Sequence, residues 1–250
     1  LLQKAIYEGS LSLILQSSRY HDLETAGTEE DRQRYNQLLE LLPPVAKTYP
    51  SEKGREAVDN GLQVLGGYGF CSDFVLQQYY RDIRIMAIYE GTTGIQSLDL
   101  LGRKITMNDG KALRLLMVEV MQSVEEAEAY EELKPYAGEL TQRLRQVEQV
   151  LQFLLPFAKR GEYERFLADA TVFMEFFGTV IIAWQWLKMG IVAKQALLRG
   201  DSTYSTDFYE SKIHTMRFFF KYELRKVEGL ADVLTSEEVL TLAEEKELIE

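Results

Sequence analysis

The sequence predicts an all-α protein made of two consecutive helical bundles. Apolar residues recur every three or four positions along most of the 250 residues, as one face of a helix requires, whereas the strict alternation of a half-buried strand is nearly absent. Hydrophobic residues make up 46% of the chain and charged residues 27%, with only 17 Gly and 5 Pro. This composition is typical of a globular protein with a buried core and excludes disordered and fibrous classes.

The first expected region, residues 1–105, is helical but interrupted by prolines. The pair at 43–44 disfavours α geometry at Leu42 and should break a helical stretch there. Pro50 should precede a new helix, which begins at Ser51 and runs to Leu65. A bundle of several shorter helices is therefore expected in this region.

The second expected region, residues 106–250, begins at a polar, turn-prone segment over 107–110, where we place the domain boundary. Apolar residues at three- and four-residue spacing predict a bundle of four or five helices, and Gly200 followed by Asp201 should stop one of them. The last helix is short and acidic. These helices are expected to begin near residues 113, 135, 162, 207 and 236.

Charge and apolar patterning exclude several functional classes. With 28 Lys and Arg against 39 Asp and Glu, the net charge of -11 repels nucleic acid and anionic lipid. The apolar stretch 172–198 contains Glu175, Lys188 and Lys194, so we expect a buried helix of a soluble protein there. The sequence opens on Leu1 without an initiator Met or a signal pattern, so we expect a fragment of a longer protein.

Several residues whose side chains could bind a metal ion or react are expected to have structural roles instead. His21 and His214 lack the partner spacing of a metal site, and Cys71 is expected to be a packed thiol. The aromatic residues around Trp184 and Trp186 are expected to pack in the core or an interface.

A glycine-rich segment follows the helix that ends near Leu65. Gln63 precedes three glycines within four residues, namely Gly66, Gly67 and Gly69. Spacing alone favours a helix C-cap with a tight turn. A second interpretation is an anion-binding concavity, since glycines allow successive N–H groups to point at a phosphate. The segment matches neither the strand-associated dinucleotide fingerprint nor the phosphate-loop pattern.

A second segment places one carboxylate at a corner between helices. Glu90 follows an apolar run, 85–89, and precedes the flexible segment 91–94. If apolar groups surround the carboxylate, loss of water favours its neutral form, as a general base or acid requires. Alternatively, this segment is only the cap of a helix running from Thr92 to Ile105, with Glu90 in water. Spacing does not separate these two interpretations.

Together, the two segments resemble the carboxyl-terminal helical domain of the acyl-CoA dehydrogenase family. That family carries Gln-x-x-Gly-Gly-x-Gly and, about twenty residues later, Arg-Asp-x-x-Ile-x-x-Ile-Tyr-Glu-Gly-Thr, and both stand here in order. The resemblance covers residues 1–105. Residues 106–250 resemble the extra helical domain appended in a bacterial branch that includes the 3-methylthiopropionyl-CoA dehydrogenases.

The resemblance implies a reaction and a catalytic residue. Glu90 matches the base that removes the α-proton of an acyl-CoA thioester while a hydride leaves the β-carbon for the flavin of FAD, giving a trans-2-enoyl-CoA. In the family, the backbone N–H of this glutamate also binds the thioester oxygen. Tyr89 and Gly91 match positions beside the bound thioester, and Thr92 matches a flavin contact.

The resemblance also implies partners. Gln63, Gly66 and Gly67 match the stretch that packs against the adenosine diphosphate part of FAD in a neighbouring subunit, which implies a homo-oligomer, either a dimer or a tetramer. A glutamine frequent in the family is replaced here by Gly94, and only Gln96 retains an amide as a flavin contact. The implied electron acceptor is electron-transfer flavoprotein, and the implied location is the bacterial cytoplasm.

Two alternatives to this function stay open. An acyl-CoA oxidase would share the base and the cofactor but pass its electrons to dioxygen. A non-catalytic helical interaction module would use the glycine turn and Glu90 only as caps. Because the family's amino-terminal and middle domains cradle the flavin ring, we expect the fragment to be inactive by itself.

Overall fold

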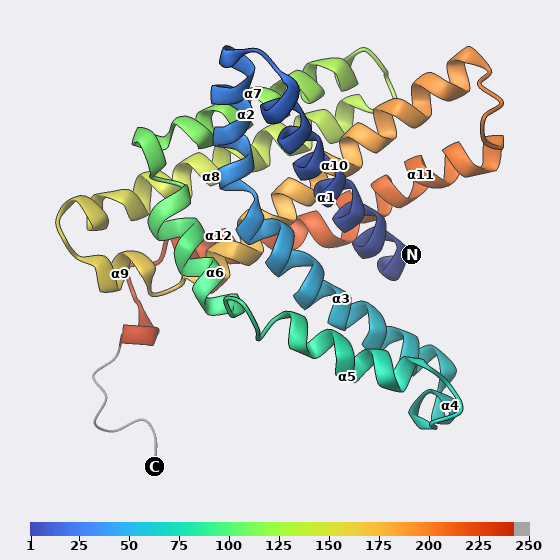
Figure 1. The fold of residues 1–250 in the computed structure, drawn as a ribbon, viewed down its shortest axis with the longest axis horizontal. Coiled ribbons are helices and arrows are strands. Elements are labelled where there is room, and N and C mark those ends of the chain that lie inside the picture. Colours follow the sequence, from blue (N-terminus) through green and yellow to red (C-terminus); the bar gives the residue numbers. More distant parts are fainter. Residues whose placement is uncertain (243–250) are drawn as a thin grey trace.

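Helices account for all the regular secondary structure in residues 1–242, the part of the chain that the computed structural model describes (Figure 1). The predicted all-α class is confirmed. The first region contains α1 (Leu2–Ala26), α2 (Glu29–Leu41), α3 (Pro43–Leu65), α4 (Gly67–Phe70), α5 (Leu76–Met86) and α6 (Thr93–Asp99). The second contains α7 (Met107–Glu128), α8 (Lys134–Lys159), α9 (Tyr163–Leu167), α10 (Ala170–Arg199), α11 (Thr206–Phe218) and α12 (Val227–Leu234).

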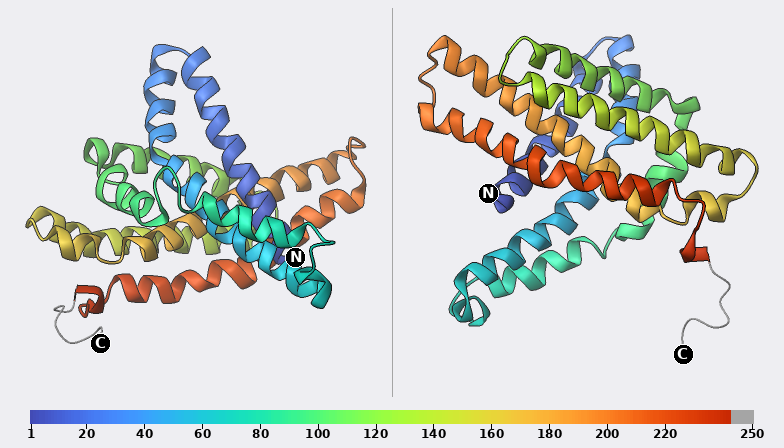
Figure 2. Two further views of the ribbon diagram at one scale, coloured as in Figure 1. Left: turned by 60° about the horizontal axis from the view of Figure 1, so that its bottom comes forward. Right: turned by 180° about the vertical axis from the view of Figure 1, so that it is seen from behind.

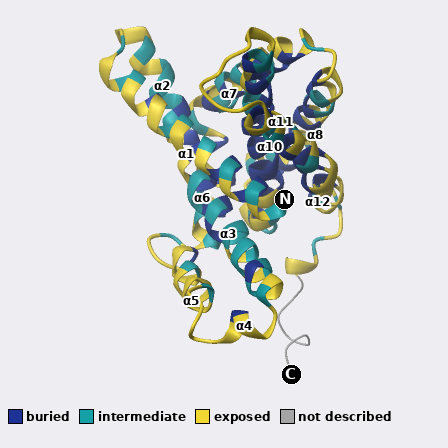
Figure 3. Cartoon of the chain, turned by 90° about the vertical axis from the view of Figure 1, so that its right-hand side faces the viewer, coloured by how far each residue is buried: buried dark blue, intermediate teal, exposed yellow. Residues whose placement is uncertain are grey.

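The long helix α10 is the centre of the fold. It packs against α1, α3 and α6 of the first region and against α7, α8, α11 and α12 of the second. Figure 3 shows buried residues gathered on α10 and on the helix faces that surround it. Trp184 and Trp186 are both buried, which confirms the expected core packing. Among the described helices, α10 alone is long and apolar enough to cross a membrane, and 83% of its most apolar window is covered by protein.

The second region forms the expected bundle. Seen from behind in Figure 2, α7, α8, α10 and α11 lie roughly parallel. Apolar positions of the predicted seam on α8, such as Leu140 and Val147, are fully buried. Gly200 ends α10 in the left-handed conformation with φ 65°, as predicted for a stop at this position.

One helix boundary in the first region differs from expectation. Pro50 lies inside α3 and does not precede a new helix. Its ring removes one helical hydrogen bond. The helix continues because Tyr49 and Ser51 are buried, and the Ser51 hydroxyl donates to the Lys47 carbonyl at 2.9 Å. The break expected at the proline pair is present, since α2 ends at Leu41 and α3 begins at Pro43, although Leu42 between them is buried and keeps α geometry (φ -83°, ψ -24°).

The second region also departs from expectation. The segment expected to be helical over 162–199 breaks between α9 and α10, and α11 continues into a π-helical turn, Phe219–Glu223. The expected helix from Ser236 is wrong for residues 236–239, which are not helical, and a short 3-10 turn follows at Leu240–Leu242. The rest of that segment, 243–250, lies outside the described residues.

The expected turn between the two regions is present and unusual. Asn108, Asp109 and Gly110 have φ values of 50°, 55° and 75°, so three successive residues are left-handed at the start of α7. The buried side chains on either side of this turn nevertheless belong to one continuous hydrophobic core. The division into domains 1–105 and 106–250 therefore stays a prediction.

Two parts of the first region project from this core. Helices α1 and α2 form one hairpin, and α3, α4 and α5 form an arm that extends in another direction (Figures 1 and 2). Helix α5 has no buried residue. This arm carries the glycine segment at its tip and Glu90 near its base.

Candidate active site

The glycine segment forms a turn at the tip of the arm. Helix α3 ends at Leu65, and Gly66 takes a positive φ of 57° as its C-cap. A Cβ atom at Gly66 or Gly67 would meet no atom within 4 Å, so the backbone lies open. Phe70 beside it is 90% exposed. The C-cap interpretation thus describes the local backbone, and the tip presents open backbone beside apolar side chains.

Two further residues of this turn have exposed side chains. Gln63 is exposed and lies two residues before the end of α3. Cys71 is also exposed, and its thiol donates to the Gly67 carbonyl at 3.5 Å. The expectation of a packed thiol is wrong, because the turn carries Cys71 out of contact with the core.

Glu90 lies at the corner between α5 and α6, as expected. The corner is closed by a hydrogen bond from the Thr93 N–H to the Ala87 carbonyl at 3.2 Å. Glu90 itself is left-handed, with φ 49°, and its side chain is exposed. Because only a few per cent of non-glycine residues take this conformation, the corner needs contacts that hold it.

The residues after Glu90 serve the corner in different ways. The Thr92 hydroxyl accepts a hydrogen bond from the Ile95 N–H at 3.3 Å and so caps α6. Gly91 has φ 89°, and a Cβ there would lie 2.5 Å from the Gln96 amide nitrogen. That amide donates to the Glu90 carbonyl at 3.4 Å. Gly91 is thus required both by its backbone angle and by the closeness of Gln96.

Lys47 is a contact of this corner that the sequence did not reveal. Its ammonium donates to the carbonyls of Tyr89 at 2.5 Å and of Glu90 at 2.9 Å, and also to the Gly91 carbonyl. It lies 5.5 Å from the centre of the Tyr89 ring. Lys47 is more than forty positions away in sequence, so no local pattern could have identified it.

An apolar groove runs beside the corner between α3 and α5. Its volume is about 590 Å³, and Tyr89, the residue before Glu90, is one of its lining residues. The remaining lining side chains are mostly apolar and include Pro50, Val58, Ile83 and Met86. Such a groove can take a hydrophobic chain beside the corner.

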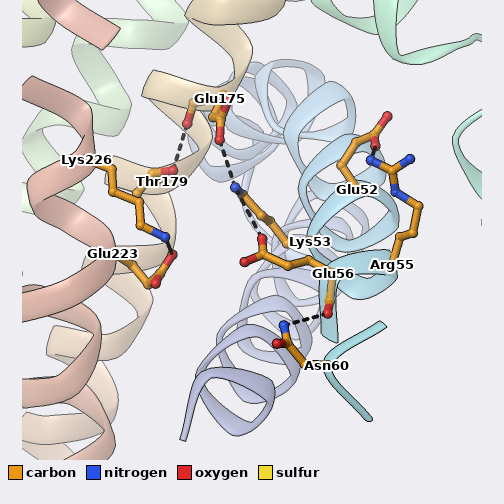
Figure 4. A network of polar contacts seen from close by, with 9 residues as sticks. All are labelled: Glu52, Lys53, Arg55, Glu56, Asn60, Glu175, Thr179, Glu223 and Lys226. Carbon is orange, nitrogen blue, oxygen red and sulfur yellow. Dashed lines mark hydrogen bonds and ion pairs between the residues drawn. The ribbon is translucent and has the colours of Figure 1, made fainter. Parts of the chain in front are cut away.

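A polar cleft lies where α3 faces α10. The Lys53 ammonium contacts Glu175 of α10 at 2.8 Å and Glu56 at 3.6 Å (Figure 4). Burial opposes the charge of Lys53, but the hydrogen bond to Glu175 and the nearby carboxylates outweigh it and raise the pKa of Lys53 above its usual value. At the edge of this cleft, Glu52 accepts a hydrogen bond from the Thr93 hydroxyl at 2.5 Å.

The structure separates the two groups of predicted site residues. Gln63, Gly66 and Gly67 lie at one end of α5, and the residues from Tyr89 to Gln96 lie beyond its other end (Figure 1). An 11-residue helix is about 16 Å long. Within one chain, the glycine turn and Glu90 therefore do not form one site. Among residues 1–242, no group of three His, Cys, Asp or Glu side chains could hold a metal ion.

Family comparisons match both regions of the chain. The family described as acyl-CoA dehydrogenase, C-terminal domain, matches residues 9–105. The family described as acetyl-CoA dehydrogenase C-terminal like matches residues 116–243. Both the glycine segment and the corner lie inside the first match.

Related sequences cover nearly the whole chain. The 3-methylmercaptopropionyl-CoA dehydrogenase of Ruegeria pomeroyi is 31% identical over an alignment of 226 residues, which covers 88% of this chain and 37% of that protein. The broad-specificity linear acyl-CoA dehydrogenase FadE5 of Mycobacterium tuberculosis is 29% identical over 93% of this chain and 39% of its own length. The chain thus spans about two fifths of these relatives.

Solved structures share the fold. An acyl-CoA dehydrogenase from Bacillus anthracis, complexed with FAD, aligns with a TM-score of 0.69 at 18% identity, over 93% of this chain and 40% of that chain. Caenorhabditis elegans ACDH-11 in complex with C11-CoA aligns with a TM-score of 0.60 at 18% identity, over 92% of this chain and 38% of its own.

Proposed function

Because the chain belongs to the acyl-CoA dehydrogenase family, we propose that it forms the carboxyl-terminal helical part of an FAD-dependent enzyme that oxidises an acyl-CoA thioester to a trans-2-enoyl-CoA. The observation that carries this proposal is the corner at Glu90. It offers an exposed carboxylate on a left-handed residue that several contacts hold, and the preceding Tyr89 lines an apolar groove. A base next to an apolar channel suits proton removal from a carbon atom of a fatty acyl chain.

Glu90 acts as the base in this proposal. Its carboxylate takes the proton from the α-carbon, and the electron pair of that C–H bond forms the new double bond as a hydride leaves the β-carbon. The Glu90 N–H has no backbone acceptor within residues 1–242, so it can donate to the thioester oxygen where negative charge develops. Tyr89 and Gly91 flank this position and would contact the thioester.

The exposed residues fit a flavin cofactor. When bound, FAD is the acceptor of the two electrons. The similar Bacillus anthracis structure complexed with FAD supports its assignment as the cofactor. The open backbone at Gly66 and Gly67 lets an adenosine diphosphate group approach closely, with Gln63 beside it. Thr92 and the Gln96 amide lie at the corner and would contact the flavin in this proposal.

The placement of these residues favours a homo-oligomer. Because the glycine turn and Glu90 lie at opposite ends of α5, we infer that one subunit contributes its turn to the FAD of a second subunit. The relative solved with C11-CoA supports an acyl-CoA substrate. Electron-transfer flavoprotein as the acceptor, and a bacterial cytoplasmic location, complete the proposal.

The test is flavin reduction in the full-length protein. Saturated acyl-CoAs of different chain lengths are mixed anaerobically with wild type and with Glu90→Gln, and bleaching of the flavin band is followed. Wild type should bleach with at least one substrate, and Glu90→Gln should be slower by about 10³-fold or more. Equal bleaching in both proteins would place the base elsewhere.

The same preparation tests the two alternatives. Oxygen consumption during turnover without an added acceptor would identify an oxidase. A full-length protein that takes up no flavin would favour the non-catalytic helical module.

A further inference from the structure

The corner that carries Glu90 is a strained piece of backbone without a core of its own. Glu90 has φ 49°, and α5 before it contains no buried residue. Within the corner, only the Ala87 side chain is buried. A left-handed residue with a Cβ relaxes toward ordinary backbone angles unless other contacts hold it. The direction of the Glu90 side chain therefore depends on what holds the carbonyls around it.

Lys47 holds those carbonyls. Three successive oxygens, those of Tyr89, Glu90 and Gly91, accept from its ammonium. An ammonium has three N–H donors and no acceptor, so these contacts use its whole donor capacity. In an extended strand, successive carbonyl groups point to opposite sides, whereas here one cation binds three in a row. The contacts of Lys47 therefore stabilise the left-handed backbone conformation of Glu90.

Helix α3, which carries Lys47, is itself firmly placed. Val45 and Tyr49, on either side of Lys47, are buried against α10, where a Cβ at Gly178 would lie 3.5–3.6 Å from both side chains. Further along α3, Glu52 accepts from the Thr93 hydroxyl at 2.5 Å. Helix α3 therefore contacts the corner both before and after Gly91. Helix α10 of the second region packs against α3 and stabilises its position.

We propose that Lys47 is a positioning residue that holds the Glu90 corner in its left-handed conformation and so aims the carboxylate at the substrate. This inference rests on the proposed role of Glu90 as the base. Lys47 acts through the three carbonyls of the corner and takes no proton itself. Loss of its ammonium lets the corner relax, which lowers the fraction of molecules whose carboxylate is correctly aimed.

The test compares three lysine variants in the full-length protein. Lys47→Met removes the donors but keeps a long apolar side chain, and Lys47→Arg restores cationic donors. Lys53→Met is the matched control, because Lys53 lies on the same helix and pairs with Glu175 without touching the corner. Hydrogen exchange of the Thr93 amide, which closes the corner on Ala87, reports the conformation without any need for activity.

In Lys47→Met, exchange at Thr93 should be faster by about tenfold. The rate constant of flavin reduction should fall about 10- to 100-fold, while KM changes by less than about threefold. Lys47→Arg should recover part of both effects, and Lys53→Met should change neither. The proposal is overturned if Lys47→Met leaves exchange at Thr93 unchanged, or if Lys53→Met reproduces its effects.

Glu90→Gln separates this inference from the proposed function. If Glu90→Gln reduces its flavin as fast as wild type, the proposed role of Glu90 has failed, whatever Lys47 does. If Glu90→Gln is inactive while Lys47→Met reduces flavin at the wild-type rate, Glu90 is the base and the role of Lys47 is wrong.

Discussion

The indole Nε1 of Trp186 donates a hydrogen bond to the backbone oxygen of Ala5, with 3.0 Å between the two atoms, inside the buried contact of α10 with α1. Ala5 lies on α1, just before the residues 9–105 that one family matches, and Trp186 lies within the residues 116–243 that the other family matches. Tyr20 of α1 likewise donates to Glu119 of α7 at 3.2 Å. The two regions are therefore joined by a buried and a partly buried hydrogen bond as well as by a continuous apolar core.

Gly9 allows this close contact, and its replacement should destabilise the protein. A Cβ at Gly9 would lie 2.7 Å from Ile182 Cγ2 and 2.9 Å from Trp186 Nε1, both buried on α10. Gly9→Ala should lower the free energy of unfolding by about 1–3 kcal/mol, as overpacking does. Urea unfolding measures the change.

The control for Gly9→Ala is Gly138→Ala on α8. A Cβ there meets no atom within 4 Å, so this change should raise stability by about 0.5–1 kcal/mol through helix propensity. Equal stability of Gly9→Ala and wild type would mean that α1 can move away from α10 at little cost.

Residues 1–105 should not fold cooperatively by themselves. Without α10 and α7, the chain loses the partners of Ala5 and Tyr20 and the surface that covers Val45. A protein cut after residue 105 should show a broad thermal transition by circular dichroism, whereas the 250-residue chain should unfold in one sharp step. A sharp transition in the short chain would establish 1–105 as an independent domain.

Lys188 should make stability depend on alkaline pH. It lies 5.0 Å from the centre of the Trp184 ring, and burial lowers its pKa more than Glu119 raises it. The folded state thus disfavours the charged lysine. This cost is fully present below the folded pKa and disappears as pH rises toward the unfolded value of about 10.4.

Lys188→Met should therefore stabilise the protein at pH 7 by on the order of 1 kcal/mol. The stability of wild type relative to the variant should rise between neutral pH and about pH 10. Urea titrations of both proteins across this range measure the difference and cancel other alkaline effects. A difference that does not change with pH would show that the Gln16 contact and the Trp184 ring fully compensate the burial of the ammonium.

Local sequence patterns predicted most helices but not how each helix behaves at a proline. Pro135 lies in the first turn of α8 as expected, because the first turn of a helix needs no N–H there. Pro50 was expected to precede a new helix, yet α3 continues through it because neighbouring residues are buried in the core. The gain from burying Tyr49 outweighs the lost hydrogen bond, and a local pattern does not contain that gain.

The candidate site was predictable only in part for the same reason. Glu90 and Gly91 could be placed at a corner because an apolar run ends there and glycine follows. Whether the Glu90 side chain is covered or exposed depends on what packs on the corner, and the structure shows it exposed within this chain. Likewise, nothing near Cys71 in the sequence indicated that its turn would point away from the core.

The sequence by itself determined the helical class, most helix positions and the family resemblance, because helix periodicity and short motifs are properties of neighbouring residues. Only the tertiary structure decided that α10 joins both regions, that the glycine turn and Glu90 lie at opposite ends of α5, and that Lys47 reaches three carbonyls of the Glu90 corner. These relationships depend on how helices distant in sequence pack, and packing is set by the whole core at once.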